Sequence, residues 1–214
     1  MHYLAAFLLV ACATAPAPPS NYDAVAQNQL CAVVRSYAPL AYRWVLHGCP
    51  ATPAPLPASA RPCRVTWHHA PDGAADLTYD DRGRLETVSN RLLTWRYQYD
   101  GDLLAAIVIG DKRTPLVFDG DTMTFGDQRF TLAPRIIAFS LAPLALVLRY
   151  EGERLIEVTN GDSTQYQIQW DHGRITKVDA LDGEPSAYTY SWVDRHLVGA
   201  SDRDGATKVE YCSK

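Results

Sequence analysis

The stretch that decides the predicted fold is Tyr188-Thr-Tyr-Ser-Trp-Val-Asp-Arg-His-Leu-Val-Gly-Ala200. Tyr188, Tyr190 and Trp192 are spaced two residues apart, which places all three side chains on one face of a β-strand. A short charged turn follows, and an apolar pair then begins a second extended segment. The stretch therefore predicts a unit made of a strand, a tight turn and a second strand.

The same unit recurs along the C-terminal two-thirds of the chain. Six copies begin with an aromatic residue and end with an apolar one: Tyr79–Leu85, Tyr99–Leu103, Phe118–Met123, Tyr150–Leu155, Trp170–Ile175 and Trp192–Leu197. Their leading aromatic residues lie 20, 19, 32, 20 and 22 residues apart, and the long gap leaves room for one extra hairpin around 125–130. Such a regular period indicates a repeat architecture.

Each copy contributes about two strands. Before the leading aromatic residue, apolar and polar side chains alternate, as around Trp95, Tyr97 and Tyr99, which is typical of a strand with one buried face. After it, Asp-Gly and His-Gly pairs supply the positive φ that tight hairpins require. We therefore predict a mainly β domain over residues 63–214, an extended antiparallel meander of about twelve to fourteen strands.

A meander has two edge strands, whose unpaired backbone groups must be closed, curled away or covered. We expect a curled sheet or open barrel whose concave aromatic face is partly filled by residues 21–62. A closed barrel is the alternative.

Residues 21–62 carry a different pattern. Apolar residues three and four apart over 22–37 predict a short N-terminal helix, with Asp23 as its cap and a proline beyond its end. Residues 41–47 fit neither a helix nor a strand decisively, and 49–62 read as a proline-rich loop. We expect the segment to be either a plug against the sheet or a loose arm held by its cysteines.

Four of the five cysteines suggest two disulfides in an exported chain: Cys31, Cys49, Cys63 and Cys212. We favour Cys31–Cys49 with Cys63–Cys212, because the second pair would join the first strand of the sheet region to the last. Closing that long loop would stabilise the fold by about 4–5 kcal/mol on the chain-entropy model. The alternative pairs Cys49 with Cys63 and Cys31 with Cys212.

The N-terminus indicates export. The first twenty residues contain no Asp, Glu, Lys or Arg, and 3–11 are nine apolar residues, which is too short to span a bilayer. We predict a signal peptide over 1–11. Leu9-Val-Ala-Cys12 resembles the lipobox of bacterial lipoproteins, which implies that Cys12 becomes an acylated N-terminus. An ordinary cleaved signal peptide without a lipid is the alternative.

The lipobox resemblance also has a consequence for location. Ala13 after the cysteine implies sorting to the outer membrane, facing the periplasm or the cell surface. Residues 12–20 would then be the lipidated cysteine and an extended Pro/Ala tether that holds the domain at a membrane.

A second resemblance concerns the repeat. Tyr79-Asp-Asp-Arg-Gly-Arg-Leu85 and Trp170-Asp-His-Gly-Arg-Ile175 are similar to the YD repeat of Rhs and teneurin-like proteins, and the similarity covers roughly residues 64–211. In large members of that family the repeats spiral into a shell. Six or seven units are too few for a shell, so the resemblance implies a twisted antiparallel sheet without an enclosed cargo.

Polar residues that might carry chemistry are explained by strand and turn structure. His68-His69 would point to opposite faces of a strand, and Asp171-His172 forms a turn pair. The remaining candidates are carboxylates that repeat with the turns: Asp80, Asp81, Asp100, Asp102, Asp119, Asp121, Glu151 and Glu153. The chain has no P-loop, Gly-x-Ser-x-Gly, HExxH or CxxC motif. We predict no catalytic residue, no cofactor and no metal site, and therefore no enzyme.

Aromatic stripes are the remaining candidate for binding. If one face of the sheet is open, these residues suit contact with a glycan or a protein: Trp95, Tyr97, Tyr99, Tyr166, Trp170, Tyr188, Tyr190 and Trp192. The net charge of −4 argues against nucleic acid as a partner.

The resulting hypothesis is an envelope lipoprotein whose repeat sheet is a structural or binding scaffold. The alternatives are an immunity-type lipoprotein that binds a secreted toxin, and a carbohydrate-active hydrolase that uses turn carboxylates.

The lipobox resemblance makes a direct prediction. Cells that express the protein should incorporate radioactive fatty acid into it, and Cys12→Ala should abolish the label while leaving the protein exported. Equal labelling of Cys12→Ala would rule out this anchor.

Overall fold

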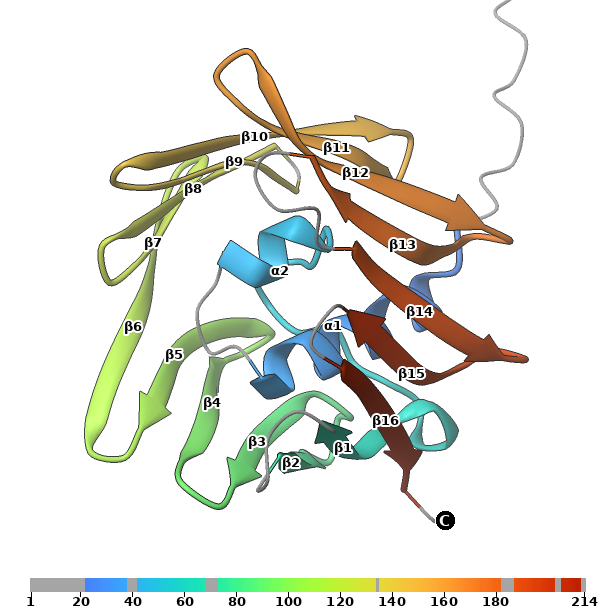
Figure 1. Cartoon of the computed structure of the whole chain (residues 1–214). Coiled ribbons are helices and arrows are strands. Elements are labelled where there is room, and N and C mark those ends of the chain that lie inside the picture. Colours follow the sequence, from blue (N-terminus) through green and yellow to red (C-terminus); the bar gives the residue numbers. More distant parts are fainter. Residues whose placement is uncertain are drawn as a thin grey trace, which may run out of the picture.

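The strands of this protein form a closed antiparallel barrel around two short helices (Figure 1). The computed structural model describes residues 22–37, 42–67, 73–133, 135–181, 187–202 and 205–212. The helices are α1 (Ala24–Tyr37) and α2 (Tyr42–Leu46), and a 3₁₀ turn, η1, spans Ala58–Ala60. Within the described residues sixteen strands follow one another as a meander, and each pairs with its neighbours in the sequence.

The first eight strands run from the proline-rich loop to the extra hairpin of the long gap. They are β1 (Pro62–Trp67), β2 (Ala74–Tyr79), β3 (Leu85–Asn90), β4 (Thr94–Asp100), β5 (Leu103–Ile109), β6 (Lys112–Asp119), β7 (Thr122–Phe125) and β8 (Gln128–Leu132). The other eight are β9 (Ile136–Leu141), β10 (Leu144–Glu151), β11 (Arg154–Asn160), β12 (Ser163–Asp171), β13 (Arg174–Ala180), β14 (Ala187–Val193), β15 (His196–Asp202) and β16 (Gly205–Tyr211).

Closure of the barrel corrects our first expectation of an open sheet. β1 pairs with β16, with Val65 opposite Val209, so neither strand is left as an edge. The Cys63–Cys212 disulfide joins the two strands at this seam, and Cys31–Cys49 joins α1 to the chain after α2. The favoured disulfide pairing is therefore confirmed, and the strand count is higher than expected.

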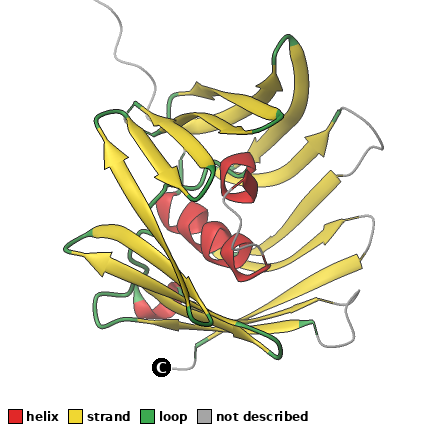
Figure 2. Cartoon of the chain, turned by 90° about the vertical axis from the view of Figure 1, so that its left-hand side faces the viewer, coloured by secondary structure: helices red, strands yellow, loops and turns green. Residues whose placement is uncertain are grey.

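The N-terminal segment is a plug, not a loose arm. The predicted helix is confirmed as α1, and the backbone N–H of Ala26 donates to the Asp23 carboxylate at its start (3.1 Å). All eight residues from Gln29 to Ser36, which together cover every side of this part of α1, are buried. A helix buried all round lies in an interior, and Figure 2 shows both helices enclosed by strands. The undecided 41–47 segment contributes a helix, α2.

The plug carries a buried cation that has no carboxylate partner among the residues the structure describes. Arg35 is 1% exposed, and its guanidinium donates to the carbonyls of Pro50 (2.5 Å) and Ala51 (3.2 Å) while lying 4.5 Å over the Trp44 ring. Burial lowers the pKa of Arg35 below its ordinary value, yet the two carbonyls and the ring compensate the charge. Arg35 thus ties α1 to the chain beyond α2.

Main-chain pairing between successive units stops short of the barrel rim that carries the repeated turns. The pairing of β3 with β4 runs from Ser89 opposite Thr94 to Thr87 opposite Arg96. It ends there, although β3 starts at Leu85. β13 and β14 behave in the same way, since their pairing ends at Lys177–Thr189. The rim carbonyls therefore need hydrogen-bond donors other than the neighbouring backbone.

In five of the six copies of the repeat the leading aromatic residue supplies that donor, and Tyr211 of β16 supplies another. The O–H or N–H of each ring reaches a carbonyl on the preceding hairpin at 2.7–3.1 Å in six pairs: Tyr79 to Pro62, Tyr99 to Leu85, Tyr150 to Ile136, Trp170 to Leu155, Trp192 to Ile175 and Tyr211 to Leu197. The aromatic position of the repeat is therefore explained by a hydrogen bond as well as by burial.

A basic residue of the preceding hairpin covers most of these rings. Arginine guanidinium groups lie 4.1–5.7 Å from four ring centroids: Arg61 over Tyr79, Arg84 over Tyr99, Arg135 over Tyr150 and Arg174 over Trp192. Two of these arginines also donate to a glycine carbonyl in the next turn: Arg84 to Gly101 (2.6 Å) and Arg135 to Gly152 (2.8 Å). We call the bonded aromatic residue with its covering cation the rim clasp.

The rim clasp predicts that removing the hydroxyl group lowers stability for one tyrosine of β4 and not for another. Tyr99→Phe removes the donor to the Leu85 carbonyl and should lower the free energy of unfolding by about 1 kcal/mol. Tyr97→Phe is the matched control, because the buried Tyr97 hydroxyl has no hydrogen-bond partner among the described residues and its removal should cost nothing. Urea denaturation of both variants measures the difference, and an equal loss in both would contradict the clasp.

Candidate functional site

The aromatic residues predicted as a ligand platform point into the barrel. Tyr188, Tyr190 and Trp192 alternate along β14 with exposed residues, as expected for one shared face. Three of the eight predicted residues are only 4% exposed: Trp95, Tyr97 and Tyr190. The other five are partly buried against the core: Tyr99, Tyr166, Trp170, Tyr188 and Trp192. Most of the stripe therefore surrounds the plug.

Two of these eight residues also line an open cleft where β13 and β14 separate. The cleft has a volume of about 420 Å³ and is lined by Asp171, His172, Arg174, Thr176, Tyr190 and Trp192. This volume is in the range of small-ligand sites. The separation of the two strands beyond the Lys177–Thr189 pair provides the space.

The polar atoms of the two aromatic rings are already bonded inside the protein. The Trp192 indole N–H donates to the Ile175 carbonyl (2.9 Å), and the Tyr190 hydroxyl is hydrogen-bonded to the buried His47 ring. The edge of the His47 ring also faces Tyr190, with centroids 5.8 Å apart. These contacts fix both rings, so what they can offer a ligand is carbon surface.

Charges in the cleft are largely balanced by the protein itself. Arg174 has an Asp23 carboxylate oxygen 3.8 Å from its Nε and donates to the Asp194 carbonyl, and its side chain is 19% exposed. Arg195 reaches the same carboxylate at 3.1 Å. The N-terminal end of the plug is thus bound at this part of the rim, where the Asp23 N–H also donates to the Gly173 carbonyl (3.0 Å).

The β12–β13 turn places a polar pair at the mouth of the cleft. His172 and Gly173 both have positive φ (47° and 79°), which is the geometry of a tight hairpin turn. The turn exposes His172 and Asp171, whose side chains lie 2.8 Å apart. The sequence identified these two residues as a turn pair, and the structure adds that they border a cleft. Arg174 and Thr176 were not predicted, because their contribution depends on the separation of β13 from β14.

The other predicted polar candidates do not converge in the described residues. Several turn carboxylates pair with a nearby arginine, as Asp80 does with Arg84 (2.7 Å) and Glu153 with Arg135 (3.1 Å). No group of three His, Cys, Asp or Glu residues there is arranged to hold a metal ion. His68 and His69 lie outside the described residues, as does Cys12.

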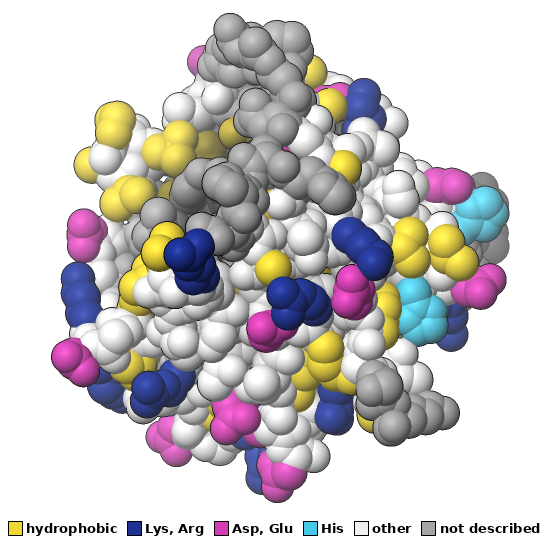
Figure 3. Space-filling model, turned by 60° about the horizontal axis from the view of Figure 1, so that its bottom comes forward, with side chains coloured by type: hydrophobic (Ala, Val, Ile, Leu, Met, Phe, Trp, Pro, Cys, Tyr) yellow, Lys and Arg dark blue, Asp and Glu magenta, His cyan; other side chains and the backbone are white. Residues whose placement is uncertain are grey.

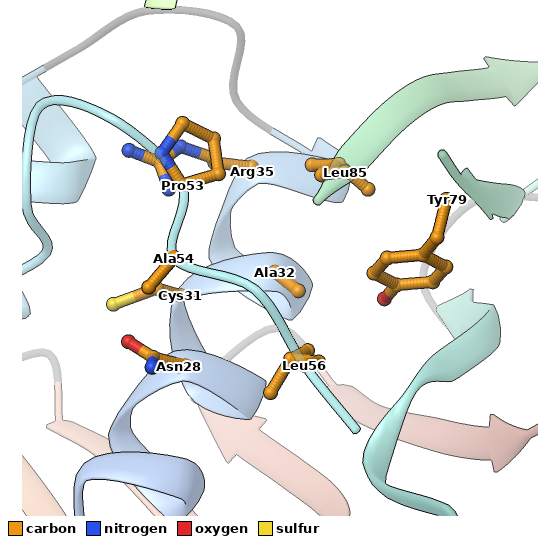
Figure 4. A pocket seen from close by; sticks show the side chains of 9 residues that line it. All are labelled: Asn28, Cys31, Ala32, Arg35, Pro53, Ala54, Leu56, Tyr79 and Leu85. Carbon is orange, nitrogen blue, oxygen red and sulfur yellow. The ribbon is translucent and has the colours of Figure 1, made fainter. Parts of the chain in front are cut away.

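A second cavity, inside the barrel, is too small for an organic ligand. It lies between α1, residues 53–56 and the β2–β3 hairpin and has a volume of about 10 Å³, room for about one water molecule (Figure 4). The cleft at β13 and β14 is therefore the better candidate.

Comparison with known proteins adds no relative: no family model matches the chain, and no curated protein matches it. Among the described helices none is long and apolar enough to cross a membrane. The function must therefore be argued from the site.

Buried tyrosines on the barrel wall predict an alkaline limit to stability. Burial raises the pKa of Tyr97 and of Tyr150 to about 12, against about 10 in an unfolded chain. Because burial makes ionisation of these tyrosines harder in the folded state than in the unfolded chain, they leave stability unchanged below about pH 10 and lower it as the pH rises to about 12. The protein should unfold cooperatively in that window, together with the rise in tyrosinate absorbance. Tyrosines that all ionise near pH 10 in a folded barrel would contradict this.

Proposed function

We propose that this protein is an exported, membrane-tethered binding protein whose cleft between β13 and β14 takes a carbohydrate. The observation that carries the proposal is the composition of the cleft, which joins fixed aromatic surface, mainly from the partly exposed Trp192, to exposed polar groups. The plug fills the barrel axis, so the ligand site lies at the rim and not in a lumen.

A sugar is the ligand class that this lining suits best. One side of a sugar ring is a patch of C–H groups that packs on aromatic carbon, and its hydroxyls both donate and accept hydrogen bonds. Asp171, His172 and Thr176 offer such partners around the rings. Because Arg174 is opposed by Asp23, and Asp171 lies against His172, a neutral ligand fits better than an ion.

Binding is better supported than hydrolysis. Most glycosidases use a pair of carboxylates about 5–10 Å apart across the bond that is cleaved. Among the described residues that line this cleft, Asp171 is the one carboxylate. The remaining turn carboxylates belong to other hairpins along the rim, which favours the scaffold hypothesis over the hydrolase.

Export and anchoring are supported by the disulfides and by the position of the plug. Two disulfides form in an oxidising compartment outside the cytosol. A lipid on Cys12 would connect through the Pro/Ala tether to Asp23, which is bound at the same rim as the cleft. We further propose that the cleft lies on the membrane-proximal part of the barrel of an outer-membrane lipoprotein.

We also propose that the repeat is of the YD type. The rim clasp supports this, because it gives a physical role to the tyrosine and to the second arginine of the motif. In Tyr79-Asp-Asp-Arg-Gly-Arg-Leu85 the tyrosine donates to the preceding hairpin, and Arg84 covers the aromatic residue of the next unit.

A blocked cleft tests the carbohydrate proposal. Thr176→Arg places a long side chain in the cleft and should weaken binding to any glycan found on an array by more than about tenfold in calorimetry. Ser140→Arg is the control, because Ser140 is an exposed residue of β9 away from the cleft and should leave binding unchanged. Failure of every glycan to bind, or binding that Thr176→Arg leaves intact, would contradict the proposal.

A further inference from the structure

We propose that the rim at β5 and β6 is a docking surface for a basic protein partner that inserts an apolar side chain. This surface, which we call the apolar rim site, consists of Leu103 and Phe118. It lies on strands other than those of the carbohydrate cleft, and the inference does not depend on the carbohydrate proposal.

The apolar rim site occupies the position of a rim clasp but lacks both of its parts. Leu103 directly precedes the buried Leu104 of β5, just as Arg84 directly precedes the buried Leu85 of β3. Phe118 follows Leu103 at the same sequence distance at which Tyr99 follows Arg84, the pair that forms a clasp. At this junction, therefore, leucine replaces the cation, and phenylalanine has no donor for the preceding carbonyl.

The substitution leaves apolar surface exposed. Leu103 is 56% exposed and Phe118 37%. A clasp would cover the ring with a guanidinium and thus present a charge to solvent, whereas this junction presents two apolar side chains. Contiguous exposed apolar residues ringed by polar ones are a mark of interaction sites.

The backbone beneath this surface is held by the plug instead of by a clasp. Leu104 is fully buried, and its backbone N–H donates to the Thr52 hydroxyl of the plug (3.0 Å). The plug therefore holds the start of β5 at this junction, where the next unit supplies no clasp. A fixed backbone reduces the entropy that a partner would lose on binding.

Charge around the apolar rim site selects the kind of partner. The two turns that flank it carry four exposed aspartates: Asp100, Asp102, Asp119 and Asp121. Asp102 pairs with Arg82 (2.7 Å), and the other three make no ion pair with a described residue. A partner with lysines or arginines around an apolar anchor complements this surface. A second copy of this chain would bring aspartates against aspartates and is disfavoured.

A control residue comes from elsewhere on the surface. On the face in Figure 3, acidic and basic side chains are interspersed, and hydrophobic side chains occur in small separate groups. Val147 is such a single exposed apolar residue, 54% exposed on β10. It provides a matched control, because it has the exposure of Leu103 without the aspartates of two adjacent turns.

The test uses the full-length protein and a synthetic helical peptide with one leucine face and lysines elsewhere. Fluorescence anisotropy should show binding that weakens with added salt. Leu103→Arg combined with Phe118→Tyr rebuilds a clasp, so it should weaken peptide binding by about tenfold or more and raise the midpoint of urea denaturation. Val147→Thr should leave both measurements unchanged.

Four results would overturn the proposal. The first is that a peptide with glutamates in place of the lysines binds equally well, and the second is that the double variant binds the lysine peptide as the parent does. The third is that Val147→Thr loses as much peptide affinity as the double variant. The fourth is that the protein self-associates and the double variant abolishes this self-association. Because the double variant is expected to be more stable than the parent, unfolding cannot account for a loss of binding.

Discussion

A barrel of sixteen strands encloses more space than its own inward side chains can fill, and the rest of this structure depends on how that space is occupied. The N-terminal segment supplies the missing core as a plug. Its helix α1 is buried all round, and the Cys31–Cys49 disulfide and Arg35 hold it to the chain that follows. Burying the Arg35 guanidinium costs free energy, and this cost is offset by its hydrogen bonds to carbonyls and by its contact with the Trp44 ring.

The rim clasp is the local counterpart of this global constraint. Successive hairpins diverge at the rim, so backbone pairing ends there, and an aromatic donor beneath a cation closes the gap. Two junctions leave surface exposed, in different ways. At β13 and β14 a clasp is present but a cleft remains beside it, and at β5 and β6 the clasp is replaced by exposed apolar residues. Both proposed binding sites lie at junctions where the repeat leaves either a cleft or exposed apolar side chains.

Much of the architecture was predictable because it follows from local rules. The two-residue alternation around Tyr188, Tyr190 and Trp192 predicted inward-facing strands, and acidic-glycine pairs predicted the hairpins. The three- and four-residue spacing predicted α1. The Cys63–Cys212 pair was predicted from the position of its two cysteines at the ends of the sheet region. The candidate site was predicted only in part, since Tyr190 and Trp192 were named but the cleft and Arg174 were not.

The sequence by itself determined the strands and the helix α1, because each depends on residue spacing along one stretch, and it favoured one of two disulfide pairings that the structure then decided. Only the tertiary structure decided that the sheet closes, that the N-terminal segment is a plug, and that one junction opens into a cleft. Closure depends on strand tilt and on contacts between β1 and β16, which no local pattern encodes. The cleft likewise depends on where pairing between β13 and β14 stops, a property of the assembled barrel.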